Sequence, residues 1–249
     1  MHTSTNCSRQ DDFHGGMRMK CAIMQPYFLP YIGYFQLMDA VDVFIIYDNI
    51  KYTKKGWINR NRYLLNSSEA VFTVPLVKGS DELQVVERTI SDSFDRRRFL
   101  DRLREAYRGA PYLNETMELL AAIVNNDETN LFRFIHQSVM RICRVLAITT
   151  EVVVSSTIPV DHTLKAEDKV LAICKAMNAG VYINAIGGVE LYSKERFASE
   201  GIALKFIKSA PVEYPQFGNS FVPWLSIVDL LMFNPTADIQ ALLKNVSYV

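Results

Sequence analysis

The sequence predicts an α/β fold with a Rossmann-like, mostly parallel sheet, to which a β-hairpin and a helical insertion are added. Short apolar runs that suit buried strands alternate with segments of helical spacing near both ends of the chain. Between these two zones, residues 92–147 carry three consecutive helical patterns. We expect the two zones to share one sheet, with the helices of the insertion packed to one side.

The first zone opens with a β-α-β unit and continues with the hairpin. Its strands are expected at 21–24 and 43–47, its helix at 34–41, and the hairpin arms at 57–66 and 70–76 around a turn at 67–69. Pro75 should end the second arm, because proline cannot donate to a strand ladder. The helices of the insertion are expected to begin at Asp92, after Pro111, and after the capping residues Asp127 and Asn130.

The second zone restores the alternation of strands and helices. Strands are expected at 152–154, 181–183 and 202–207, helices at 164–177 and 192–199, and a last helix from Leu225 and Ser226. Residues 1–18 lack apolar periodicity and are interpreted as a disordered N-terminal extension. Residues 19–249 then form a single domain.

Composition limits the classes of function. The 27 basic and 27 acidic residues cancel, so no overall field favours duplex nucleic acid. The four cysteines form neither a CxxC pair nor a Cys/His cluster, which argues against a zinc site and a disulfide framework and favours the reducing cytoplasm. No apolar run approaches the roughly 20 residues that a bilayer span requires, so no membrane insertion is expected. No set of residues demands a metal.

Polar and aromatic residues follow the first two strands of the predicted sheet. In open α/β sheets, ligands bind beyond the carboxyl ends of the strands. The residues expected there, as binding groups, are Gln25, Tyr27, Tyr31, Gly33, Tyr34 and Asn49, with Asp48 as a catalytic base. The alternative is that the tyrosines are amphipathic edges of the core.

Cations gather around Trp57 in the first arm of the hairpin. Between residues 51 and 62 no acid accompanies them, so an anionic ligand is expected. The binding residues predicted here are Lys54, Lys55, Trp57, Asn59, Arg60, Asn61 and Arg62. Alternation along a strand would let only the asparagine row or the arginine row face a given site. The alternative is a solvated basic edge that discourages aggregation.

Two later stretches add candidates. Asn184, Gly187, Gly188 and Tyr192 follow a predicted strand, where adjacent glycines suit either a tight turn or close approach of a ligand to the backbone. His162 follows the strand at 152–154 and is the second catalytic candidate. Asp229 lies among apolar residues, so we expect it to accept hydrogen bonds, or an Arg or Lys, from the loops of the site.

Several separated motifs together resemble one known family. The segment Phe28–Tyr34 is loosely similar to the P-x-H-x-G-H turn of the nucleotidylyltransferase superfamily, with tyrosine in place of both histidines. More specifically, the chain resembles the WbqC-like protein family. The motifs that carry this resemblance are QPYFLPYIGYF at 25–35, YDN at 47–49, WINRNR at 57–62, YINAIGGVELY at 182–192 and FVPWLSIVDLL at 221–231.

The resemblance implies a transferase that tailors amino sugars in bacterial surface polysaccharide (O-antigen, lipopolysaccharide) biosynthesis. Glycyl, aminoacyl or another acyl group would pass to a nucleotide-linked amino sugar. The expected partners are a sugar nucleotide and an acyl or aminoacyl carrier protein; no prosthetic group is expected, and the activated donor is a carrier thioester, an aminoacyl adenylate or an acyl-coenzyme A. The alternatives are nucleotidyl transfer or adenylate formation, and a non-catalytic protein that binds sugar nucleotides or a carrier protein.

Overall fold

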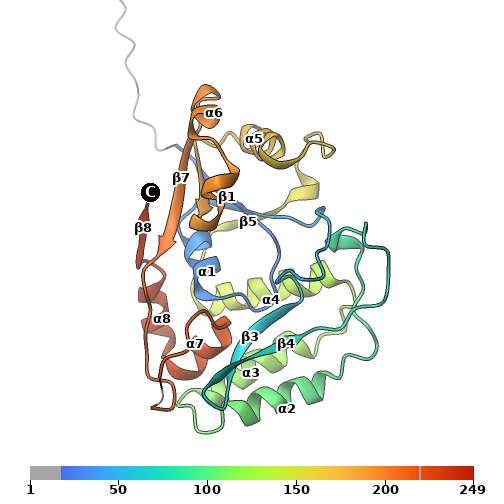
Figure 1. Cartoon of the computed structure of the whole chain (residues 1–249), viewed down its shortest axis with the longest axis vertical. Coiled ribbons are helices and arrows are strands. Elements are labelled where there is room, and N and C mark those ends of the chain that lie inside the picture. Colours follow the sequence, from blue (N-terminus) through green and yellow to red (C-terminus); the bar gives the residue numbers. More distant parts are fainter. Residues whose placement is uncertain (1–17, 219) are drawn as a thin grey trace, which may run out of the picture.

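The computed structural model describes residues 18–218 and 220–249, and its centre is a six-stranded sheet (Figure 1). The strand order is β5-β2-β1-β6-β7-β8, and every neighbouring pair is parallel except β7 with β8. The bounds are β1 (Lys20–Met24), β2 (Val43–Ile46), β5 (Glu151–Val154), β6 (Val181–Ala185), β7 (Ala203–Ser209) and β8 (Val246–Tyr248). The mostly parallel sheet, shared by the two α/β zones, is thus confirmed. Nearly all of the predicted N-terminal extension lies outside the described residues.

The register brings the carboxyl ends of three strands to one level. Met24 of β1 pairs with Ile46 of β2, which pairs with Val154 of β5. The chain places β2 and β5 on one side of β1 and then β6 and β7 on the other. The strand order therefore reverses between β1 and β6, and the carboxyl ends beside such a reversal are where α/β sheets bind ligands.

Alternate side chains of the central strands enter two separate cores. Phe44 and Ile46 join the larger core with α1 (Ile32–Asp39) and α7 (Ile227–Phe233), whereas Val43 and Ile45 join the smaller core with α5 (Ala166–Ala176) and α6 (Lys194–Ser199). Strand β2 is buried at every position, because a parallel sheet covered on both faces favours continuous apolar strands. In Figure 1, α5 and α6 lie at the opposite end of the molecule from α2 and α3.

The hairpin forms a small sheet of its own. Strands β3 (Arg60–Leu65) and β4 (Ser68–Thr73) pair in antiparallel fashion. Asn66 and Ser67 connect them with φ of 50° and 62°, the conformation that a two-residue hairpin turn requires. The hairpin is confirmed, but its turn is at residues 66–67 and not at 67–69, because asparagine adopts this left-handed conformation more readily than most residues.

The helical insertion comprises α2 (Arg96–Ala106), α3 (Leu113–Val124) and α4 (Leu131–Val145). The side chain of Asn130 accepts from the Arg133 N–H at 3.1 Å, which confirms it as the cap of α4. Asp95 and not Asp92 caps α2, since the segment before it folds as a turn in which the Phe94 N–H bonds to the Ser91 carbonyl. Among the helices of residues 18–218 and 220–249, none combines the length and apolar composition needed to cross a membrane.

Short elements account for most differences near the C-terminus. Ser226 caps α7, as predicted, and accepts from the Val228 N–H. Ser193 caps α6, which therefore starts at Lys194 and not at residue 192, and a 3₁₀ helix, η3 (Ile186–Leu191), precedes it. Helix α8 (Thr236–Leu242) and strand β8 were not predicted, because α8 buries one residue, Ile239, and β8 buries none, so neither leaves a clear apolar period.

Candidate functional site

Three of the motifs meet at the loop that follows β1. The Phe28 N–H donates to the carbonyl of Ile58 at 2.9 Å. The carbonyl of Leu29 accepts from Asn61 Nδ2 at 2.9 Å and from Ser226 Oγ at 2.7 Å. Leu29 itself has a φ of 48°, a strained value for leucine that these bonds maintain. The loop is thus held between the hairpin and the start of α7.

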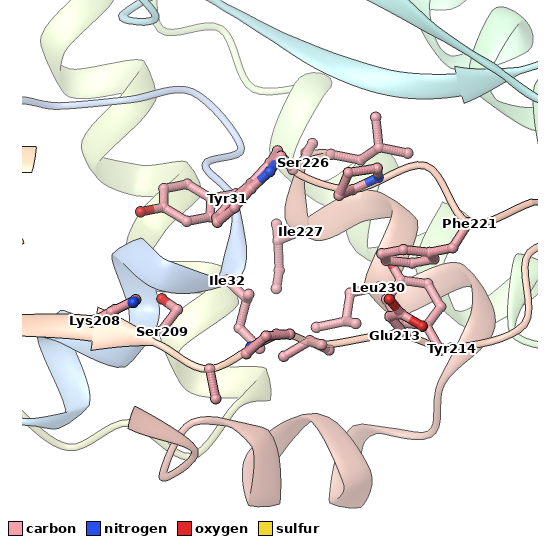
Figure 2. A pocket seen from close by; sticks show the side chains of 16 residues that line it. Tyr31, Ile32, Lys208, Ser209, Glu213, Tyr214, Phe221, Ser226, Ile227 and Leu230 are labelled. Atoms are coloured by element: carbon pink, nitrogen blue, oxygen red, sulfur yellow. The ribbon is translucent and has the colours of Figure 1, made fainter. Parts of the chain in front are cut away.

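Two adjoining cavities open around this loop. The larger has a volume of about 630 Å³ and lies beyond the carboxyl end of β7, against the N-termini of α1 and α7 (Figure 2). The smaller, of about 150 Å³, lies between the loop and the hairpin. Tyr31 and Trp224 line both cavities and form the junction between them. Trp224 is 61% exposed and has a φ of 61°, so the junction also carries backbone strain.

The small cavity collects five residues predicted as binding groups. They are Tyr27, Tyr31, Trp57, Asn61 and Arg62. Asn61 and Arg62 both line it, so the expectation that only one of the two rows could face a site is wrong. Both residues lie in the first half of β3 and are paired with β4, so the small cavity is lined from both faces of this strand.

The basic residues near Trp57 are paired more fully than the local sequence indicates. Lys54 and Arg62 form ion pairs with Asp81 and Glu69, at 2.6 and 3.0 Å, and these acids come from other segments. The guanidinium groups of Arg60 and Arg62 lie 5.2 and 5.0 Å from the centre of the Trp57 ring. Trp57 therefore holds two cations beside the cavity.

Lys55 lies in the loop before β3, and Arg60 is the first residue of that strand. Arg60 donates to the carbonyls of Gly56 and Lys55, at 2.9 and 2.6 Å, and so fixes the course of this loop. The side chain of Lys55 is exposed. Neither residue lines either of the two cavities.

Several other predicted binding residues support the loop after β1 or the hairpin from beneath. The hydroxyl of Tyr34, which is 2% exposed, donates to the carbonyl of Gln25 at 3.1 Å. Asn59 accepts from Tyr52 and donates to the carbonyl of Val74. A Cβ on Gly33 would overlap the Tyr31 ring, so this glycine is what lets Tyr31 lie across the start of α1.

The tyrosines of the loop remain hydrogen-bond donors. Burial raises the pKa of Tyr27 and of Tyr31 above the ordinary 10.0, so both phenols are protonated near neutral pH. Tyr27 donates to Gln25 Oε1 at 3.3 Å. Tyr31 is therefore a neutral donor at the junction of the cavities.

Asp229, in the first turn of α7, is fully buried and accepts three hydrogen bonds. Tyr107 donates to one oxygen at 2.9 Å, and Tyr214 and Gln216 donate to the other at 2.6 Å each. The sequence left open whether neutral hydrogen-bond donors or an Arg or Lys would pair with Asp229. Within the described residues the partners are neutral donors, and no Arg or Lys contacts it. Burial raises the pKa of Asp229, while the three hydrogen bonds oppose that rise.

A second polar group lies at the carboxyl ends of β2 and β5. Ser155, which follows β5, donates from Oγ to Asp48 at 2.8 Å and lies 2.7 Å from Asn49 Oδ1. The Ser156 N–H also donates to the Asp48 carboxylate, at 2.9 Å. Asp48 is 3% exposed, so its carboxylate ties the ends of the two strands together.

His162 is held by the same group. Lys169 donates to Asn49 Oδ1 at 3.3 Å, so the amide nitrogen of Asn49 is the atom that lies 2.9 Å from His162 Nδ1. His162 Nδ1 then accepts a hydrogen bond, and Nε2 donates to the carbonyl of Ile158 at 3.1 Å. Both nitrogens of the imidazole are therefore engaged in hydrogen bonds.

Lys169 is a residue of this group that the sequence analysis missed. It is 7% exposed, and its ammonium lies 5.4 Å from the centre of the Tyr47 ring. Burial lowers the pKa of Lys169, and the nearby Asp48 carboxylate raises it. The sequence did contain one indication that Lys169 is buried. It lies four residues before the buried Ile173 and therefore on the same face of α5.

The double-glycine bend does not use the backbone conformations that only glycine adopts readily. Neither Gly187 nor Gly188 has a positive φ. A Cβ on Gly188 would overlap the side-chain amide of Asn184, whereas one on Gly187 would meet open space. Tyr192 lies beside Tyr182, and burial raises its pKa. Gly188 is therefore required by the side chain of Asn184.

The predicted residues thus fall into separate groups. The two cavities are lined by the loop after β1, the start of β3 and the segment before α7. Asp48, His162, Asn184, Gly187 and Gly188 do not line either of them. Trp224, Lys208 and Glu213 do, although none was a predicted site residue. For Trp224 a sign was present, because it lies in one of the motifs that carry the family resemblance.

Comparison with known proteins gives one family and one relative. The model of the WbqC-like protein family matches residues 25–241. Uncharacterized protein Rv1507c of Mycobacterium tuberculosis (strain ATCC 25618 / H37Rv) is 30% identical over 224 residues, which are 88% of this chain and 95% of that protein. No solved structure matches the chain.

Proposed function

Because the chain belongs to the WbqC-like protein family, we propose that it is a transferase that tailors amino sugars for a bacterial surface polysaccharide. An acyl or aminoacyl group would pass from an activated donor to the amine of a nucleotide-linked sugar. The donor would be presented by a carrier protein or by a soluble carrier such as coenzyme A, and the reaction would take place in the cytoplasm.

The observation that carries this proposal is the pair of cavities joined at Tyr31 and Trp224. A two-substrate transfer needs two binding spaces that meet where the reacting atoms approach. The small cavity offers Arg62 for a phosphate and aromatic rings for a sugar or a base. The large cavity leaves room for the donor.

At the junction, the amine nitrogen would attack the carbonyl carbon of the donor, forming a C–N bond as the bond to the leaving group breaks. The protonated phenol of Tyr31, which lines both cavities, would donate a hydrogen bond to the oxyanion of the tetrahedral intermediate. We assign this donation to Tyr31 in place of the backbone of Gly187 and Gly188, which lies outside both cavities.

Asp48 and His162 are the proposed acceptors of the proton that the amine loses. Both lie outside the cavities, and His162 Nδ1 accepts from Asn49. His162 can act as a base only after Asn49 turns away from it. This condition favours, as a second candidate function, a protein that binds sugar nucleotides without catalysis.

Mass spectrometry of the reaction mixture separates the two functions. A nucleotide-linked amino sugar is incubated with each class of donor, with wild type, with Trp224→Ala, and with the matched surface variant Tyr248→Ala. The transferase predicts an acylated sugar nucleotide with wild type and Tyr248→Ala, and at least about tenfold less product with Trp224→Ala. Binding of the sugar nucleotide without any product supports the non-catalytic alternative and overturns the transferase.

A further inference from the structure

The interior wall of the large cavity is apolar and offers few free polar atoms. The polar side chains that line it deep in the fold are already engaged: Ser226 Oγ donates to the Leu29 carbonyl at 2.7 Å, and the Tyr214 hydroxyl donates to Asp229 at 2.6 Å. The apolar lining residues are Ile32, Ala210, Pro211, Val212, Phe221, Pro223, Leu225, Ile227 and Leu230. A polar group placed inside would lose its hydration without gaining partners.

The charges of the large cavity belong to exposed side chains. Lys208 and Glu213 line it and are both exposed to solvent. Figure 2 shows them on opposite sides of the cavity, with Ile227 and Leu230 between them. A ligand that fills this space therefore has an apolar part inside and a charged part near Lys208 or Glu213.

We propose that the large cavity holds the apolar acyl chain of a thioester donor. This inference rests on the proposed function and names the class of its donor. A glycyl or other aminoacyl group would bring an ammonium into the interior of the cavity, where no acid lies among the described lining residues apart from the exposed Glu213, at a high cost in desolvation. The exposed ammonium of Lys208 instead complements the phosphate that a coenzyme A or carrier-protein arm bears.

The transfer balances with this donor. The amine nitrogen bonds to the thioester carbonyl carbon, and the C–S bond breaks. The leaving thiolate takes up a proton equivalent to the one that the amine loses. An amide and a free thiol are the products, so no oxidant or reductant is required.

Calorimetric titration of the full chain, without any sugar nucleotide, tests the inference. Octanoyl-coenzyme A and acetyl-coenzyme A are titrated into wild type, into Val212→Trp, which fills the cavity, and into Val77→Trp. The last is a matched control, since Val77 is 50% exposed and lies outside both cavities. Thermal unfolding checks that both variants fold.

Wild type and Val77→Trp are expected to bind octanoyl-coenzyme A at least about tenfold more tightly than acetyl-coenzyme A, and Val212→Trp is expected to lose most of this preference. Equal affinities in wild type, or a preference that survives in Val212→Trp, overturn the inference. Tighter binding of a non-hydrolysable glycyl-adenylate analogue overturns it too.

Octanoyl-pantetheine phosphate, titrated alongside, distinguishes the two sources of the thioester. Binding equal to that of octanoyl-coenzyme A points to a carrier protein, weaker binding points to coenzyme A, and either supports the inference. Product formation from polar donors without a chain-length preference would refute this inference and leave the proposed function standing. A chain-length preference in binding without any product would support this inference and refute the proposed function.

Discussion

Asp229 shows how a single buried charge joins distant parts of the chain. Its carboxylate accepts from Tyr107 of the segment after α2 and from Tyr214 and Gln216 before α7. Tyr107 in turn accepts from the Leu64 N–H of the hairpin at 3.0 Å. The sequence indicated that Asp229 is buried and accepts hydrogen bonds, but a donor 122 positions away has no local pattern that could reveal it.

We predict that Asp229→Asn lowers the free energy of unfolding by about 1–3 kcal/mol, because an amide presents one oxygen to three buried donors. The pKa of Asp229 is raised above its ordinary 3.8, so the folded protein binds this proton more tightly than the unfolded chain does. Its stabilising contribution is complete below pH 3.8 and declines as pH rises through the raised pKa.

Urea denaturation of wild type and Asp229→Asn at a series of pH values measures how the stabilising contribution of Asp229 declines as pH rises. The difference between the two free energies of unfolding should shrink as pH rises from about 4. A difference that grows with pH would show that the hydrogen bonds outweigh burial.

Gly187 and Gly188 provide a matched pair of variants in adjacent positions. A Cβ on Gly188 would overlap the amide of Asn184, and one on Gly187 would touch nothing. We predict that Gly188→Ala destabilises the protein by about 1–3 kcal/mol, as overpacking does, whereas Gly187→Ala stays within about 0.5 kcal/mol of wild type. Differential scanning calorimetry of both variants is the measurement, and equal effects would contradict this account of the bend.

At the scale of elements, Ser226 couples a helix to the loop of the site. Its Oγ accepts from the Val228 N–H as the cap of α7 and donates to the Leu29 carbonyl. Ser193 is the control, because it caps α6 at an exposed position. We predict that Ser226→Ala costs about 2–3 kcal/mol, the sum of a cap and a buried hydrogen bond, and that Ser193→Ala costs about 1 kcal/mol.

Hydrogen exchange adds a local measurement for Ser226→Ala. Protection of the Phe28 and Ile227 amides should fall in this variant, since both bond across the loop after β1. Unchanged protection of these amides would mean that Ser226 does not hold the loop.

The long elements could be predicted because their burial leaves a periodic pattern. Strand β2 is apolar throughout, and α4 buries residues at helical spacing from Leu131 to Cys143. Helix α8 and strand β8 could not be predicted, because they bury too few residues to leave such a pattern. They depend on partners elsewhere in the fold, as β8 does on its pairing with β7.

At the scale of the whole molecule, the sequence predicted that polar loops would gather at one edge of the sheet. It did not predict which residues would line the cavities and which would form the separate group around Asp48. The rule that ligands bind at the carboxyl ends of parallel strands placed the loop after β1 at the site. Whether Asp48 faces a cavity or the first residues after β5 depends on side-chain packing, which no spacing encodes. In the structure, the Asp48 carboxylate accepts a hydrogen bond from Ser155, and Tyr31, Arg62 and Trp224 line the small cavity.

If the joined cavities bind a sugar nucleotide, as we propose, the guanidinium of Arg62 and the aromatic rings of the small cavity must contribute to the affinity. Isothermal titration calorimetry with a uridine-diphosphate-linked amino sugar tests it on wild type, Arg62→Ala and Arg97→Ala, the last being a control whose side chain is 92% exposed. We expect binding to wild type and to Arg97→Ala, and an affinity reduced about tenfold or more in Arg62→Ala. Equal affinity in all three proteins, or no binding to wild type, would contradict it.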